Sequence, residues 1–114
     1  SFFLDYKNLV EPLKNYFYNA YHIYVVKLKL ENLNISRDDI FKKMKEANIG
    51  VNVHYIPIYY HTYYKKLGYK KGLCPVSENT YEKIITLPIY PLLENKDIDY
   101  VCKTLLKILS SNKK

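Results

Sequence analysis

The stretch Y-H-I-Y-V-V-K-L-K-L, residues 21–30, predicts a β-strand from which the rest of the fold can be built outward. It is rich in β-branched and aromatic residues, and its second half alternates strictly between apolar and basic side chains. This alternation is typical of a strand with one buried and one exposed face. We therefore expect a sheet that contains residues 21–30.

A helix should follow this strand. Ser36 precedes Asp38 and Asp39, which places a capping hydroxyl before two carboxylates that suit the positive end of a helix dipole. The apolar positions that share one face of this helix are Ile40, Phe41, Met44 and Ala47. Gly50 then offers the chain an exit. Residues 51–56 predict a second strand that ends at Pro57, so the two strands and the helix would form a β-α-β unit.

The remaining sequence predicts three further helices and one strand. A short helix is expected over residues 61–67 with a turn at Gly68, and Pro75 suits the first turn of a helix that runs to Lys83. Residues 84–89 should form a short strand. Asn95, Lys96 and Asp97 should cap a last helix, whose apolar positions are Ile98, Val101, Cys102, Leu105 and Leu109.

Composition limits the classes of function. A chain of 114 residues supports one domain, and its net charge of +7 raises the question of a polyanionic partner. Clustering of basic residues is confined to Lys65, Lys66, Lys70 and Lys71, so a nucleic-acid-binding module is disfavoured and stays open as an alternative. Steep salt dependence of DNA or RNA binding would favour it.

Cysteine and hydropathy patterns exclude other classes. Cys74 and Cys102 have neither metal-ligand spacing nor the density of a disulfide scaffold, and we expect both to be buried thiols. His54 and His61 are seven residues apart without a neighbouring carboxylate, which argues against a metal site. No apolar run approaches the length of a membrane span, and residues 1–5 lack the features of a signal peptide, so a cytoplasmic location is expected.

The polar and aromatic run H-Y-I-P-I-Y-Y-H, residues 54–61, is the main candidate for a binding site. His54 could hydrogen-bond a phosphate or carboxylate or exchange a proton, and Tyr55 could donate its hydroxyl. The alternative is that both are half-buried residues satisfied by backbone groups, and spacing alone favours that structural role. The many tyrosines of residues 55–69 could stack on bases or sugars, or pack on a neighbouring domain.

Four blocks occur in one order that resembles a known family. They are Y-H-I-Y-V-V with the following S-R-D-D-I-F-K-K-M-K-E-A-N-I-G-V, then H-Y-I-P-I-Y, then G-L-C-P-V-S-E, then T-L-P-I-Y-P-L-L. Together, residues 19–109 resemble the C-terminal domain of the DegT/DnrJ/EryC1/StrS nucleotide-sugar aminotransferases. The run from His54 onward most resembles members that aminate a UDP-4-keto-6-deoxy sugar on the route to pseudaminic acid.

The resemblance implies a function for a larger enzyme. Members use pyridoxal phosphate and an amino donor, commonly glutamate, and act as homodimers of fold type I. The small domain closes over the sugar side of the site, so His54 and Tyr55 would face substrate, with Pro57 and Tyr59 shaping the wall. The Schiff-base lysine belongs to a large domain upstream, so we assign no catalytic and no cofactor-binding residue to this chain and expect the fragment alone to be inactive and free of cofactor.

The resemblance also implies an organisation. Residues 1–18 would be a segment connecting to the missing large domain, and residues 19–114 would form the C-terminal small domain. We expect an α+β fold with a few-stranded, mainly antiparallel sheet, helices packed on one face, and the other face docked on the large domain. Loss of the catalytic part could also leave a stand-alone, non-catalytic interaction domain, and that alternative stays open.

Overall fold

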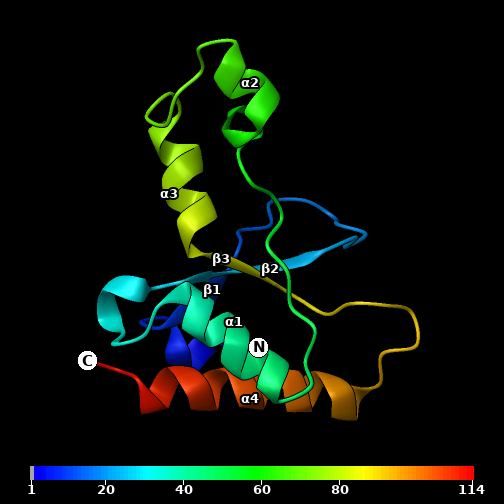
Figure 1. The fold of residues 1–114 in the computed structure, drawn as a ribbon. Helices are drawn as coiled ribbons and strands as arrows, with labels where there is room; N and C mark the ends of the chain where they lie inside the picture. The colour runs from blue at the N-terminus through cyan, green and yellow to red at the C-terminus, as the bar shows by residue number, and fades with distance from the viewer. Residues whose placement is uncertain (1) are drawn as a thin grey trace.

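The computed structural model describes residues 2–114, which form a small sheet, a pair of long helices and a projecting arm (Figure 1). The strands are β1 (Val10–Pro12), β2 (Tyr24–Leu28) and β3 (Ile84–Leu87). The α-helices are α1 (Arg37–Glu46), α2 (Thr62–Lys66), α3 (Pro75–Lys83) and α4 (Asn95–Ser111), and the 3-10 helices are η1 (Leu4–Tyr6), η2 (Leu30–Asn32) and η3 (Ile58–Tyr60).

The sheet has the strand order β1-β2-β3, and both pairs are antiparallel. Val10 lies opposite Leu28, and Val26 lies opposite Ile85. Alternation along β2 sends Val26 to one face, where the main core lies, and its neighbour Val25 to the other. All four residues of β3 are buried, so both faces of this strand are covered.

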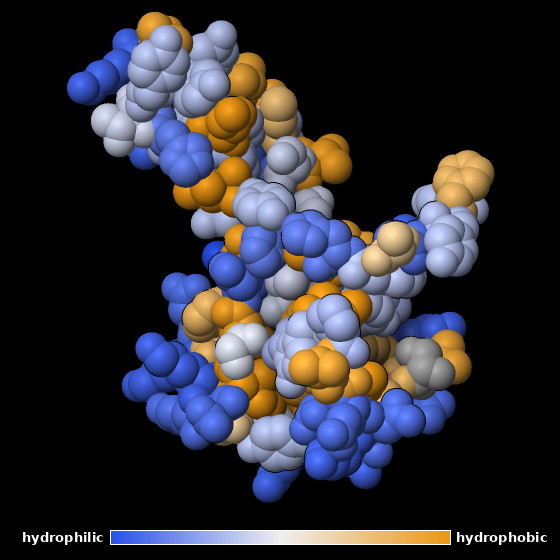
Figure 2. All heavy atoms as spheres, turned by 90° about the vertical axis from the view of Figure 1, so that its right-hand side faces the viewer, coloured by the Kyte–Doolittle hydropathy of each residue, from blue (hydrophilic) through white to orange (hydrophobic). Residues whose placement is uncertain are grey.

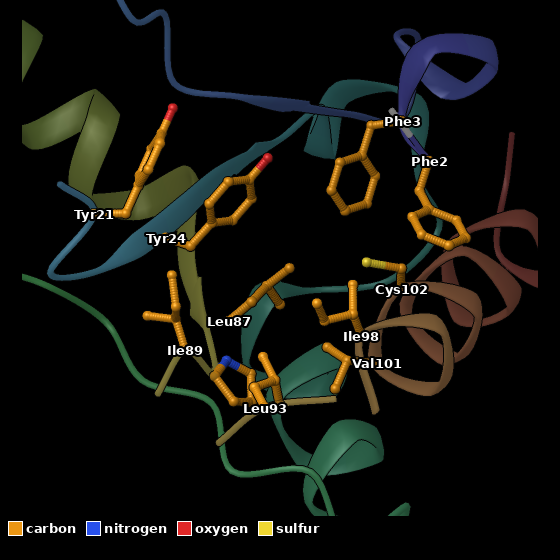
Figure 3. A pocket seen from close by; sticks show the side chains of 11 residues that line it. Phe2, Phe3, Tyr21, Tyr24, Leu87, Ile89, Leu93, Ile98, Val101 and Cys102 are labelled. Carbon is orange, nitrogen blue, oxygen red and sulfur yellow. The ribbon is translucent and has the colours of Figure 1, made fainter. Parts of the chain in front are cut away.

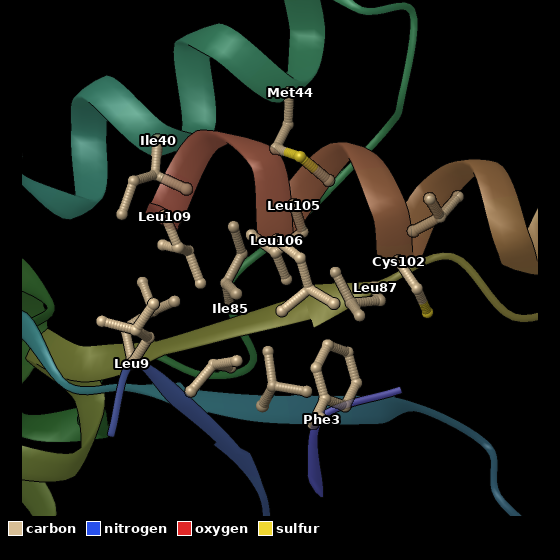
Figure 4. Packing of buried hydrophobic residues seen from close by; sticks show 14 of the residues in the cluster. Phe3, Leu9, Ile40, Met44, Ile85, Leu87, Cys102, Leu105, Leu106 and Leu109 are labelled. Atoms are coloured by element: carbon tan, nitrogen blue, oxygen red, sulfur yellow. The ribbon is translucent and has the colours of Figure 1, made fainter. Parts of the chain in front are cut away.

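Helices α1 and α4 pack together on one face of the sheet (Figure 1). Figure 4 shows Ile40 and Met44 of α1 next to Leu105 and Leu109 of α4, above Ile85. These five side chains are essentially inaccessible to solvent. The prediction of an α+β fold with a mainly antiparallel sheet and helices on one face is confirmed.

The helix ends follow the chemistry of their sequences. The Ser36 hydroxyl accepts a hydrogen bond from the Asp39 amide at 3.1 Å, so the predicted cap of α1 is confirmed. Pro75 occupies the first turn of α3, also as predicted. Helix α4 is capped one residue earlier than predicted, because Glu94 and Asp97 form a reciprocal capping box.

The predicted strand over residues 51–56 is wrong, and so is the β-α-β unit. Only Asn52 pairs, in an isolated antiparallel bridge with Thr86. In this antiparallel register, residues 53–56 would lie opposite residues 82–85, and residues 82 and 83 belong to α3 and not to a strand. The Asn52 side chain also accepts a hydrogen bond from the Val53 amide, a local contact that competes with strand pairing.

The arm, which we define as residues 57–83, contains η3, α2 and α3 and projects away from α1 and α4 (Figure 1). The predicted turn at Gly68 is present, with φ of 95°. The prediction that both cysteines are buried holds for Cys102 and is wrong for Cys74. Cys74 precedes α3 near the far end of the arm, where residues 65–77 are all exposed and nothing covers it.

Candidate functional site

A segment that we call the strap, residues 52–59, carries all four predicted site residues and links the body to the arm. At its start, the backbones of Asn52 and Thr86 exchange two hydrogen bonds, of 3.1 and 2.7 Å. Two residues later, His54 Nδ1 lies 3.0 Å from Thr86 Oγ1. The start of the strap therefore pairs with the edge of β3, and the hydroxyl of the buried Thr86 hydrogen-bonds the His54 imidazole.

His54 and Tyr55 form the exposed polar part of the strap. Their rings meet edge to face, with centroids 4.6 Å apart and planes at 71°. Tyr55 is 66% exposed and His54 is half-buried. Within residues 2–114, Thr86 is the one hydrogen-bond partner of the His54 side chain. The second ring nitrogen and the Tyr55 hydroxyl are thus available to bond oxygen atoms of a ligand.

Pro57 and Tyr59 lie in a different environment, because both are buried, and Tyr59 packs within the arm beside the first turn of α3. The Tyr59 hydroxyl donates to Glu78 Oε1 at 2.6 Å and accepts from the Cys74 amide at 3.3 Å. The Gly72 amide donates to the same Glu78 oxygen at 2.7 Å. The structure therefore places His54 and Tyr55 together at the surface and directs the Tyr59 hydroxyl into the arm.

Burial and the hydrogen bond between Tyr59 and Glu78 shift the pKa of both groups. The hydrogen bond from Tyr59 is the main reason that the pKa of Glu78 lies below its ordinary value, against the opposing effect of burial. Burial, followed by the bond to Glu78, raises the pKa of Tyr59. Burial also raises the pKa of Tyr60, which lies beside the same carboxylate. Glu78 is thus an ionised acceptor at neutral pH and Tyr59 is its neutral donor, whereas the buried Tyr60 hydroxyl is neutral and has no hydrogen-bond partner among the described residues.

A second candidate site is an apolar cavity of about 390 Å³ between the sheet and the first turns of α4. Figure 3 shows Phe3, Tyr24, Leu87 and Val101 around this space. Its lining residues are Phe2, Phe3, Tyr21, Tyr24, Leu87, Pro88, Ile89, Leu93, Ile98, Val101 and Cys102. None of the predicted site residues lines it.

The residues of this cavity do not fit a cofactor held through a Schiff base and a phosphate. The lining contains no lysine and no cationic side chain. Its one thiol, Cys102, has a pKa raised by burial and therefore stays protonated at neutral pH. The cavity is suited to apolar side chains.

Sequence reasoning missed Glu78 and Thr86. A glutamate in the first turn of a helix is normally explained by the helix dipole, and Glu78 in fact lies 6% exposed under Tyr59. Thr86 occurs in an apolar strand, where threonine is common. The sequence signal available was their presence in two of the family-like blocks, P-V-S-E and T-L-P.

Metal sites and membrane-spanning helices find no support among residues 2–114. In this part of the chain, no group of three His, Cys, Asp or Glu side chains is arranged to hold a metal ion. None of the helices described is both long and apolar enough to span a bilayer.

Comparison with known proteins identifies relatives along nearly the whole chain. The sequence profile of the DegT/DnrJ/EryC1/StrS aminotransferase family matches residues 5–106. The uncharacterized protein MJ1066 of Methanocaldococcus jannaschii is 37% identical over 113 residues, which cover 97% of this chain and 29% of that protein. The spore coat polysaccharide biosynthesis protein SpsC of Bacillus subtilis is 34% identical over 80% of this chain and 24% of its own length.

Solved structures agree with these matches. A putative sugar aminotransferase of Streptococcus pneumoniae, Spr1654, superposes with a TM-score of 0.79 at 27% identity, over 90% of this chain and 26% of that one. PseC of Helicobacter pylori, an aminotransferase of pseudaminic acid biosynthesis, gives a TM-score of 0.85 at 22% identity, over 96% of this chain and 29% of its own. At that identity, PseC supports the fold alone. The chain thus spans under a third of the length of each relative described.

Proposed function

Because the chain belongs to the DegT/DnrJ/EryC1/StrS aminotransferase family, we propose that it is the C-terminal domain of a pyridoxal-phosphate-dependent sugar aminotransferase. The observation that carries this proposal is the family match over residues 5–106, which includes the strap and the arm. The substrate that we propose is a UDP-4-keto-6-deoxy sugar, with glutamate as amino donor, on a route to pseudaminic acid or a related surface glycan. We further propose a cytoplasmic homodimer.

The division of labour within this enzyme follows from the residues available. Pyridoxal phosphate supplies the electron sink for amino transfer. The apolar cavity has no group that fits it, so we propose that residues outside this chain hold the cofactor and that the chain alone is inactive. The contribution of residues 1–114 is then to bind and orient the sugar nucleotide.

His54 and Tyr55 are the residues that we propose to face the sugar. Both are accessible and polar, and they lie on a segment held against buried elements. His54 can bond a sugar hydroxyl or phosphate oxygen through its second ring nitrogen, and Tyr55 can donate its hydroxyl. We also propose that Pro57 and Tyr59 shape the wall of the sugar-binding surface.

The remaining partner is the larger domain. Figure 2 shows apolar side chains exposed on the arm and on the body beneath it. Val76 is 82% exposed and Phe17 is 85% exposed, and the apolar cavity is open at its rim. We propose that the large domain of the same enzyme covers part of this surface.

Replacement of His54 by alanine tests this function in the complete enzyme that contains the chain. The variant should lower kcat/KM for the UDP-4-keto-6-deoxy sugar by roughly ten- to a hundredfold, the equivalent of one hydrogen bond to a charged or strongly polar group. The half-reaction with glutamate should keep its rate. The half-reaction with glutamate is measured by the cofactor's absorbance, and amination of the sugar nucleotide is measured by mass spectrometry of the product.

The matched control is His61→Ala, since His61 is an exposed histidine on the arm. It should leave both half-reactions unchanged. Equal loss in both half-reactions for His54→Ala would overturn the sugar-side role. Absence of any aminated sugar nucleotide from the unaltered enzyme would overturn the proposed substrate class. The 114-residue chain alone, mixed with pyridoxal phosphate, should show no change in absorbance on addition of glutamate.

A further inference from the structure

Both ends of the strap are hydrogen-bonded to one continuous unit, formed by α3 and β3. Helix α3 ends at Lys83 and β3 begins at Ile84, with no loop between them. Thr86 of β3 holds the start of the strap, and Glu78 of α3 holds its end through Tyr59. A short extended segment is therefore stretched along a single helix-strand unit.

Between these two contacts, Pro57 is buried and residues 55 and 56 are exposed. Its middle residues make no strand pairs, and Tyr55 and Ile56 are 66% and 39% exposed. The main core lies on the opposite face of the sheet, beneath α1 and α4. The position of the middle of the strap is consequently set by its two ends.

At the end of the strap, Glu78 is the centre of a buried group of hydrogen bonds. One carboxylate oxygen accepts both the Tyr59 hydroxyl and the Gly72 amide, and the Cys74 amide donates back to the Tyr59 hydroxyl. A hydrogen bond to an ionised carboxylate is shorter and stronger than one between neutral groups. The cluster therefore holds the Tyr59 ring, and with it the C-terminal end of the strap, against the first turn of α3.

The fastening at Thr86 acts on the imidazole itself. Thr86 is 5% exposed, and its hydroxyl lies 3.0 Å from His54 Nδ1. A bond to one ring nitrogen fixes the orientation of the ring, and the Thr86 hydroxyl can form it with either tautomer because a hydroxyl both donates and accepts. The second nitrogen has no hydrogen-bond partner among residues 2–114 and is left to meet a ligand.

We infer that Glu78, Tyr59 and Thr86 are positioning residues, which set the placement of His54 and Tyr55 and thereby the affinity for the sugar nucleotide. This role rests on the proposed function, since it assumes that His54 and Tyr55 meet the sugar. It assigns a task to the P-V-S-E and T-L-P blocks beyond packing.

The test uses Tyr59→Phe in the complete enzyme, because this change removes one hydroxyl and keeps the buried ring. The Cys74 amide loses its acceptor and Glu78 loses a donor, so hydrogen exchange of residues 54–60 and of Cys74 should become faster. Steady-state kinetics should show KM for the UDP-4-keto-6-deoxy sugar raised on the order of tenfold, because the sugar-facing groups are no longer pre-placed. KM for glutamate should not change.

Matched variants separate positioning from general damage. Tyr63→Phe removes an exposed hydroxyl from the same arm and should change neither exchange nor KM. Thr86→Val preserves shape and removes the hydroxyl that bonds His54, while the backbone bonds to Asn52 remain, so it should also raise the sugar KM. Glu78→Gln keeps an acceptor oxygen without the charge and should give a smaller rise than Tyr59→Phe.

The outcomes distinguish this inference from the proposed function. Faster exchange with an unchanged sugar KM would mean that the cluster is purely architectural, and unchanged exchange would mean that it does not hold the strap. Either result overturns the inference while leaving the function in place. If the unaltered enzyme fails to aminate the sugar nucleotide, the function falls, and with it the inferred role.

Discussion

The body and the arm of this domain are held together by different kinds of interaction. In the body, a continuous apolar core joins the sheet to α1 and α4. In the arm, only Pro57, Tyr59 and Glu78 are buried, and apolar residues such as Val76 and Leu67 face solvent. The body is stabilised by the hydrophobic effect, whereas the arm depends on a few directed hydrogen bonds.

Contacts at the base of the arm follow the same polar pattern. Arg37 at the start of α1 donates a hydrogen bond to the Tyr81 carbonyl and lies 4.9 Å from the centre of the Tyr81 ring. The rings of Tyr81, Tyr60 and Tyr59 then meet edge to face in sequence. Directed contacts fix geometry with little buried area, so the arm can be well placed and still be the first part to open.

The largest effect should come from breaking the core of the body. Leu105→Ala removes a fully buried side chain between α4 and the sheet, and it should lower the free energy of unfolding by about 2 to 5 kcal/mol. Leu92→Ala, at a leucine that is 85% exposed, should have almost no effect. Urea denaturation of the 114-residue chain measures both, and equal losses would contradict the assignment of the core.

A smaller effect should come from the turn that supplies the Gly72 amide. Gly72 has φ of 99°, a conformation that costs an L-residue about 1 to 2 kcal/mol, although a Cβ there would meet no other atom. Gly72→Ala should therefore loosen the arm through its backbone alone. The control is Gly50→Ala, where neither crowding nor a positive φ opposes the side chain. Thermal unfolding, together with hydrogen exchange of the amides of residues 72–78, would show whether the loss of stability is confined to the arm.

The smallest effect should be the pH dependence of the arm. The pKa of Glu78 is lowered below its ordinary value of 4.5, so its stabilising contribution is complete above that value and is lost as the pH falls through the lower folded-state value. Thermal midpoints of the unaltered chain and of Glu78→Gln should thus converge on acidification. Other carboxylates titrate equally in both chains. A difference between the two thermal midpoints that stays constant with pH would therefore contradict this prediction.

Much of the helical structure could be predicted because its signals are local. Ser36 caps α1, Pro75 starts α3, and the apolar rhythm of the last helix places Leu105 and Leu109 in the core. Each feature depends on residues within one or two helical turns. The α+β class followed from these elements together with the resemblance to the family.

The strap could not be predicted because its contacts are distant in sequence. Residues 51–56 have strand-like composition, but pairing stops at Asn52, partly because residues 55 and 56 would lie opposite the end of α3 and not opposite a strand. Tyr59 bonds a glutamate nineteen residues away, and His54 bonds a threonine thirty-two residues away. Nothing in the local pattern of either partner marks it as buried.

The direct junction of α3 and β3 has a mechanical consequence. A helix that enters a strand without a loop has no flexible joint, so a push on the exposed end of the arm becomes a torque on β3. Movement of the arm and movement of β3 are then coupled. We expect that a partner bound to Val76 or Leu67, at the far end of the arm, would also shift Thr86 and the His54 imidazole that is hydrogen-bonded to it.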